Sequence, residues 1–263
     1  MYNRKAIKLR SKAAFKANYW KTVLVSFIFT FIVGGTASSV GSNAAKGFAG
    51  GSTAPAAGVY GAQNQMDQLL SGDPQAAAIA LAVILGALGI AIALGAAINI
   101  FLVEPIKIGA YSFYDKNEKA PAELGEICAG FKTGYMRNVL AMFLVRLFTA
   151  IGSLLFVIPG ILFSYGFRLV PYILAENSDL TAMEALKESH RLMKGNRWKL
   201  FVLELSFIGW NFLTALTLGL LGIFFVIPYE EQSKAGFYEA IKKIAAGIDP
   251  EAQEEIFVEE KEA

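Results

Sequence analysis

The stretches KANYWKTVLVSF (residues 16–27) and KGNRWKLFVLEL (residues 194–205) share one chemical pattern, and FKTGYMRNVL (residues 131–140) repeats it in a weaker form. Each has a lysine, then an asparagine or glycine, then a tryptophan or methionine, and then a second basic residue before an apolar run. Tryptophan concentrates at membrane–water interfaces, and lysine and arginine stay on the cytoplasmic side. The pattern therefore predicts three points at which the chain enters a membrane.

The matched positions of this motif also predict local structure. Asparagine and glycine tolerate the left-handed conformation that often closes a helix, so an incoming surface helix is expected to end there. Three chance lysines before apolar runs are the alternative explanation. The aligned residues are Lys16, Lys132 and Lys194; Asn18, Gly134 and Asn196; Trp20, Met136 and Trp198; and Lys21, Arg137 and Lys199.

The composition supports a membrane protein. Hydrophobic residues make up 55% of the chain, compared with about 45–50% in soluble domains. The net charge of +2 gives no signal for nucleic-acid binding. The single cysteine, Cys128, excludes an intrachain disulfide, and the single histidine, His190, excludes a histidine-rich metal cluster. Motifs of hydrolases, metalloenzymes and redox enzymes are absent from the sequence, so we expect no catalytic residue, metal or cofactor.

The uncharged runs predict an all-α polytopic membrane protein with about six transmembrane helices in one domain, residues 1–248. IPG (158–160) and Thr217–Gly219 are the expected tight turns. One long tilted span over residues 200–229 is the competing interpretation and would leave five spans. The predicted spans are 20–40, 76–103, 139–157, 160–175, 200–216 and 218–229.

Two further segments are expected to lie outside the membrane. Residues 41–75 are rich in glycine and alanine and should form an extracytoplasmic loop. Residues 249–263 carry seven acids and one lysine, which is typical of a disordered tail. The start of the chain also resembles a signal peptide, but the repeated motif favours a retained helix.

Prolines and basic residues give the order and orientation of the spans. Pro105, Pro171 and Pro228 each follow a second apolar run, which predicts three helical-hairpin repeats. Residues 1–22, 104–138 and 176–199 hold seventeen lysines and arginines, whereas the opposite side holds Lys46 alone. The positive-inside rule therefore places both termini in the cytoplasm.

The basic segments should form cytoplasmic amphipathic helices that lie in the interface or pack on one another. Pro121 is expected in the first turn of one such helix, Cys128 in its core, and His190 at an interface. Thr181 and Glu184 are spaced as a capping box. The apolar faces are Leu124, Ile127, Cys128 and Phe131; Met183, Leu186, His190 and Met193; and Phe237, Ile241, Ile244 and Ile248.

Three ionisable residues fall inside predicted spans: Arg146, Arg168 and Glu204. Charge at that depth costs about 2.5–3.5 kcal/mol on insertion scales, so each needs a partner. We expect Glu204 to pair with Arg168 or Arg146. Such a pair either fixes helix register or forms a polar site for an anionic substrate or lipid headgroup.

The motif residues are predicted interface anchors. They either mark topology alone or also contact anionic lipid headgroups, which attract nearby basic residues. These residues are Lys16, Trp20, Lys21, Lys132, Arg137, Lys194, Trp198 and Lys199.

The strings EPIKIGAYSFY, VIPGI, YILAEN and LMKGNRWKLF, followed by ELSFIGW and VIPYEEQSKAGFYEAI, carry a family resemblance. Together they resemble the bacterial membrane family known as domain of unknown function 975. The resemblance implies a multi-span protein of the bacterial cytoplasmic membrane and implies no activity.

The expected function is that of a non-enzymatic scaffold, accessory or envelope-associated protein. Its expected partners are the bilayer and a protein partner or a second copy of the chain, without nucleic acid. A transporter or lipid-translocating protein for a small or anionic substrate is the alternative, because internal repeats and charges inside spans are common in transporters.

Overall fold

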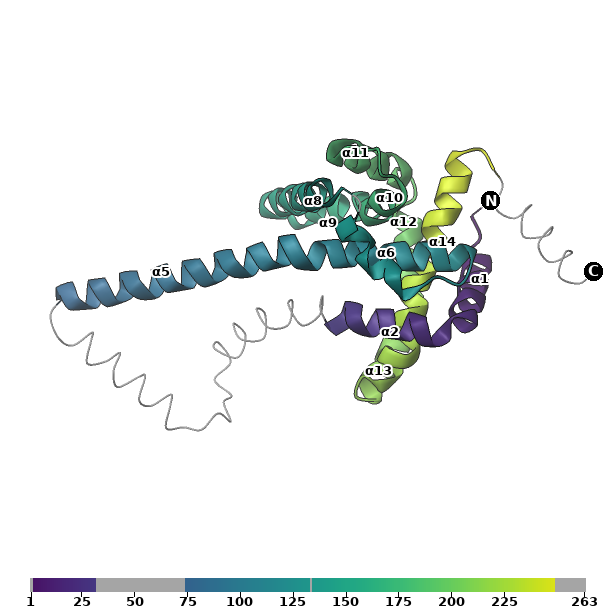
Figure 1. Ribbon diagram of the computed structural model, residues 1–263, viewed down its shortest axis with the longest axis horizontal. Coiled ribbons are helices and arrows are strands. Elements are labelled where there is room, and N and C mark those ends of the chain that lie inside the picture. Colours follow the sequence, from purple (N-terminus) through teal and green to yellow (C-terminus); the bar gives the residue numbers. More distant parts are fainter. Residues whose placement is uncertain (1, 32–73, 133, 249–263) are drawn as a thin grey trace, which may run out of the picture. The chain divides into compact units, whose positions relative to one another are not determined.

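The computed structural model describes residues 2–31, 74–132 and 134–248, and the regular structure in these ranges is entirely helical (Figure 1). Two compact units are present: residues 1–33 with 100–263, and residues 34–99. The predicted tail and most of the predicted loop lie outside the described residues.

In the smaller unit, α5 (Pro74–Ile98) is an apolar helix of 25 residues, longer than the ~20 residues that cross a bilayer. Its described side chains from Leu81 to Gly95 are exposed. Exposing so much apolar surface to water is unfavourable, so α5 requires an apolar environment.

The larger unit contains helices of four to 21 residues. They are α1 (Arg4–Ala17), α2 (Tyr19–Phe29), α6 (Glu104–Lys119), η3 (Leu124–Cys128), α7 (Ala129–Lys132), α8 (Tyr135–Leu155), α9 (Val157–Gly166), α10 (Val170–Glu176), α11 (Ala182–Met193), α12 (Arg197–Leu205), α13 (Ile208–Leu216), η4 (Gly222–Val226) and α14 (Ile227–Ala245).

Four described helices are long and apolar enough to cross a membrane: Leu81–Lys119, Tyr135–Leu154, Ile158–Glu176 and Arg197–Leu216. Tyr19–Phe29 is apolar but shorter. The all-helical class and these four segments agree with the sequence-based expectation, whereas six spans and the repeat remain predictions.

Helix α14 lies in the centre of the larger unit and packs against α1 and α6 (Figure 1). Phe237, Tyr238 and Ile241 are buried, together with Phe113 and Tyr114 of α6. Of the two arrangements expected for this amphipathic helix, the structure therefore has the packed one.

Of the three repeat-marking prolines, Pro171 lies at the start of a separate helix, whereas Pro105 and Pro228 lie where a π-helix passes directly into an α-helix. Pro105, Pro171 and Pro228 occupy the first or second position of α6, α10 and α14, and a missing N–H costs little at the start of a separate helix. A π-helix of five residues precedes each of two helices: η2 (Asn99–Val103) precedes α6, and η4 precedes α14.

The first predicted turn is displaced. The chain breaks at Phe156, which is extended, and Pro159 and Gly160 lie in the first turn of α9 rather than between helices. Proline suits a first helical turn. A Cβ on Gly160 would lie 2.8 Å from Cα of Ser153, so this glycine permits close packing of α9 on α8. The second turn is placed as predicted, with Leu218 and Gly219 at positive φ.

The expected helix after Pro121 is also different. A 3-10 helix, η3, precedes the four-residue α7, and Pro121 lies before both. Cys128 is exposed rather than in the core. Of the three residues predicted to be left-handed, Gly134 is, whereas Asn18 and Asn196 are not; in the third copy the left-handed residue is Gly195, just before Asn196. The capping box of Thr181 and Glu184 is confirmed.

Two glycines join η3 and α7 to α6. A Cβ on Gly109 would lie 1.9 Å from the carbonyl oxygen of Ile127, and one on Gly130 would lie 2.0 Å from that of Pro105. The neighbouring atoms are backbone, so they cannot move aside like a flexible side chain.

We therefore expect Gly109→Ala to lower the free energy of unfolding by about 2 kcal/mol, the usual cost of forcing extra atoms into a packed site. Gly125→Ala in η3 is the matched control, because a Cβ there meets no atom within 4 Å. Thermal melting of both purified variants measures the effect. Equal melting temperatures would show that this contact is looser than described.

Candidate functional site

Arg168 and Glu204 form one site, as predicted. Arg168 lies in the turn between α9 and α10, and its guanidinium donates to the Glu204 carboxylate of α12 at 2.9 Å. The Tyr165 hydroxyl donates to the other oxygen of Glu204 at 2.7 Å. Each oxygen of the Glu204 carboxylate therefore has a donor. Hydrogen bonds to a charged group are stronger than those between neutral groups.

Lys234 of α14 completes the site. Its ammonium lies 2.9 Å from carboxylates of Glu230 and Glu231 and 3.9 Å from Glu204. Burial alone would lower the pKa of Lys234, but Glu231 and then Glu230 outweigh it and raise the pKa above its ordinary value. Lys234 therefore stays charged and links α14 to α12.

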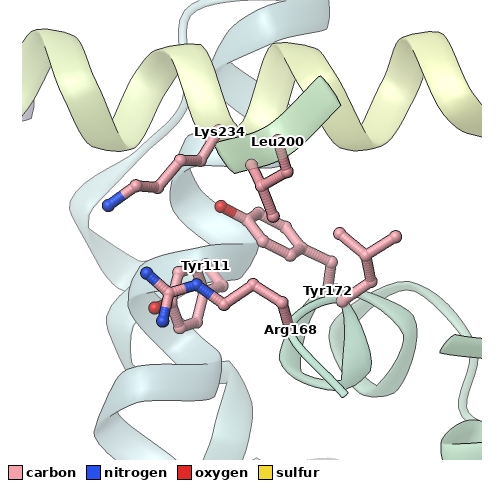
Figure 2. Close-up of a pocket in the computed structure, with 6 residues that line it drawn as sticks. Tyr111, Arg168, Tyr172, Leu200 and Lys234 are labelled. Carbon is pink, nitrogen blue, oxygen red and sulfur yellow. The ribbon is translucent and has the colours of Figure 1, made fainter. Parts of the chain in front are cut away.

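Arg168 and Lys234 also line a small pocket between four helices. Figure 2 shows Tyr111, Tyr172, Leu200 and Lys234 converging from α6, α10, α12 and α14, with Arg168 beside Tyr111. The cavity volume is about 10 Å³, which is room for one water molecule. The Tyr172 hydroxyl is buried and has no hydrogen-bond partner among the described residues, so a single water would satisfy it.

Arg146 does not belong to this site. It pairs with Glu104 at the start of α6, with 2.8 Å between its Nε and the carboxylate. Lys107 donates to the same oxygen at 3.1 Å. The three ionisable residues in predicted spans therefore form two separate ion-pair sites.

The sequence reasoning missed Lys234 and Glu104 because both lie just beyond apolar runs, where charges are common. For Lys234 one signal was available. Glu231 and Glu230 lie three and four residues before it, and this spacing is typical of ion pairs on a helix.

A third ionic cluster joins the ends of α6, α10 and α14. Lys119 lies 3.0 Å from Asp115, 3.2 Å from Glu239 and 3.7 Å from Glu176. Lys242 pairs with the same two glutamates. Burial opposes ionisation of Glu239, but the hydrogen bond from Lys242 outweighs it and lowers the pKa.

Asp115, Glu176 and Glu239 could offer three oxygens to a metal ion, since these atoms lie within 4.8 Å of one another. However, the ammonium groups of Lys119 and Lys242 already lie against these oxygens. The arrangement therefore fits an ion-pair cluster better than a metal site.

The predicted interface anchors fall into two groups. Trp20 and Trp198 are 74% and 71% exposed, and Met136 at the matched motif position is 67% exposed; their place at a membrane interface stays a prediction. Lys16, Lys21, Lys132 and Lys194 are exposed as well, and Lys199 is half-buried.

Arg137 has a different environment. Its guanidinium donates to the carbonyl oxygens of Leu174 (3.0 Å), Asn177 (2.8 Å) and Leu180 (3.2 Å), and also to that of Ser178. These carbonyls lie at and beyond the end of α10. Arg137 therefore caps this helix, and it is less free to contact a lipid than the lysines.

A helical structure with four helices that are long and apolar enough to cross a membrane is compatible with a membrane protein. Residues 75–245 match the family model described as Protein of unknown function (DUF975), and the chain belongs to this family. The expectation from the sequence motifs is thereby confirmed. Neither a curated protein nor a solved structure matches the chain.

A double-mutant cycle measures the coupling of Arg168 and Glu204. We expect Arg168→Gln and Glu204→Gln each to lower the melting temperature, with a coupling free energy of about 1 to 2 kcal/mol. The exposed pair Glu188 and Arg191 of α11, 2.7 Å apart, is the control, and its coupling should stay below about 0.5 kcal/mol. Equal coupling in the two pairs would contradict a structural role for Glu204.

Proposed function

We propose that this chain is a non-enzymatic integral protein of the bacterial cytoplasmic membrane. It would act as a scaffold or as an accessory or envelope-associated subunit through lipid or protein contacts. In this proposal six apolar segments pair in three hairpins, and both termini face the cytoplasm. The excess of lysine and arginine in residues 1–22, 104–138 and 176–199 supports this orientation.

The observation that carries the proposal is the small size of the pocket beside the Arg168–Glu204 ion pair. Both oxygens of the Glu204 carboxylate accept hydrogen bonds, and the adjoining cavity of about 10 Å³ holds no more than a water molecule. Ligand pockets are usually 300–1,000 Å³ in volume. A transporter in this conformation would need a far larger polar cavity.

Exposed apolar side chains support contacts as the mode of action. Leu154, Phe156 and Ile158 around the α8–α9 turn are 89%, 73% and 72% exposed. Surfaces of this kind contact lipid or other proteins rather than water.

Two measurements on the purified protein distinguish transport from a function based on lipid or protein contacts. We expect native mass spectrometry of particles extracted with their own lipid to show protein or lipid species bound at fixed stoichiometry. Proteoliposomes holding gradients of inorganic phosphate, acetate or glutamate should give no current above protein-free vesicles. A current that Arg168→Gln abolishes and Arg191→Gln preserves would contradict the proposal and establish transport.

A further inference from the structure

The α13–η4 hairpin extends beyond the packed helices as an apolar projection. Its residues, 208–226, contain no charge. None of the residues of α13 is buried, and Phe212, Leu216, Leu218 and Leu220 are 68%, 66%, 94% and 62% exposed. An exposed turn in water would normally be polar, so the surroundings of this tip must be apolar.

The base of the hairpin lies at a ring of aromatic and basic side chains. The Phe207 and Tyr229 rings are 5.1 Å apart, and the Lys8 ammonium lies 4.0 Å above the Phe207 ring. Lys8 also donates to the Ser206 hydroxyl at 3.1 Å, and Arg4 to the Val202 carbonyl at 3.5 Å. Basic residues with aromatic residues mark the headgroup level of a membrane.

The hairpin is too short to cross a bilayer from this base. Helix α13 has nine residues, which span about 14 Å at 1.5 Å per residue. The hydrocarbon core is about 30 Å thick. Helix α12, before the base, lies along α1 and α14: Arg4 donates to the Val202 carbonyl, and the Lys234 ammonium is 3.9 Å from Glu204. The proposal therefore leaves α12 outside the hydrocarbon. If α12 were inside, Arg197–Leu216 would have the 20 residues of a full span, which is the outcome that would contradict the proposal.

The backbone N–H groups of the turn are satisfied without water. The N–H groups of Leu218, Gly219 and Leu220 donate to the carbonyl oxygens of Ala215, Thr214 and Thr217. The N–H of Leu221 donates to the Thr217 hydroxyl at 3.2 Å. In hydrocarbon backbone polar groups need such partners, so these N–H groups are compatible with burial in lipid.

The threonine side chains of the hairpin are also compatible with burial in lipid, because their hydroxyls have partners within the hairpin. The hydroxyls of Thr214 and Thr217 donate to carbonyls of their own helix, Trp210 at 3.0 Å and Leu213 at 3.2 Å. Asn211 lies in the first turn of α13, nearest the base.

We propose that the α13–η4 hairpin is a re-entrant element that enters the bilayer from the cytoplasmic side and turns at its midplane, with Leu218 among the lipid acyl chains. This inference rests on the membrane placement proposed above and changes the depth of the third hairpin. The fifth and sixth predicted segments then do not cross the membrane, and the C-terminus remains cytoplasmic.

Depth measurements on a single-cysteine protein test the proposal. In a Cys128→Ser background, Leu218→Cys carries a fluorophore in vesicles whose lipids hold a quencher at the headgroup or near the chain end. We expect the strongest quenching from the chain-end position. Leu9→Cys, another leucine that is 69% exposed, is the control on α1 and should be quenched most from the headgroup.

Labelling with membrane-impermeant thiol reagents tests whether the hairpin crosses the bilayer. We expect Leu218→Cys to lose labelling from both sides of sealed vesicles, and Leu9→Cys to be labelled from the cytoplasmic side. Labelling of Leu218→Cys from the outer side, with headgroup quenching, would show a full span and overturn the re-entrant hairpin. If neither residue were quenched by any lipid, the membrane placement itself would fail, which is a distinguishable result.

Discussion

The side-chain amide of Gln232 is the contact on which the packing of the larger unit depends. It is fully buried on α14, and it donates to the Tyr114 carbonyl at 3.0 Å and to Glu118 at 2.9 Å. Its oxygen accepts from Asn117 at 3.0 Å. An unsatisfied buried group costs about 1–3 kcal/mol, so rotation or withdrawal of α14 would be opposed by several such losses. Apolar burial drives the helices together, whereas this amide fixes their register.

The same network extends to the start of the chain and to the functional site. Asn18 donates to Asn117 at 2.8 Å, which ties the α1–α2 junction to α6. Lys234, two residues after Gln232, is thereby held near Glu204 beside the small pocket. Tyr229, three residues before it, packs on Phe207 at the base of the hairpin. One buried helix thus positions both the ionic site and the proposed re-entrant element.

The sequence predicted those features that depend on rare residues in apolar runs. Glu204 and Arg168 stood out because charge in such runs needs a partner, and they do pair. The hairpin turn at Gly219 was visible because positive φ favours glycine. Glu104, Gln232 and Lys234 were not predicted, because polar residues just beyond apolar runs normally face solvent. Tertiary packing buries Gln232 on α14 and Glu104 on α6, where Glu104 pairs with Arg146 of α8.

Helix α14 is an internal helix and not a helix lying on the membrane surface. Ala235 separates these arrangements: it is buried in the structure. On a surface helix with Phe237 and Ile241 towards lipid it would point to water, about 200° away from Phe237. Reaction of a water-soluble maleimide with Ala235→Cys, compared with the exposed Ala245→Cys, in a Cys128→Ser background is the most direct measurement. The account predicts that Ala235→Cys reacts only after denaturation, whereas equal rates for the two variants would contradict it.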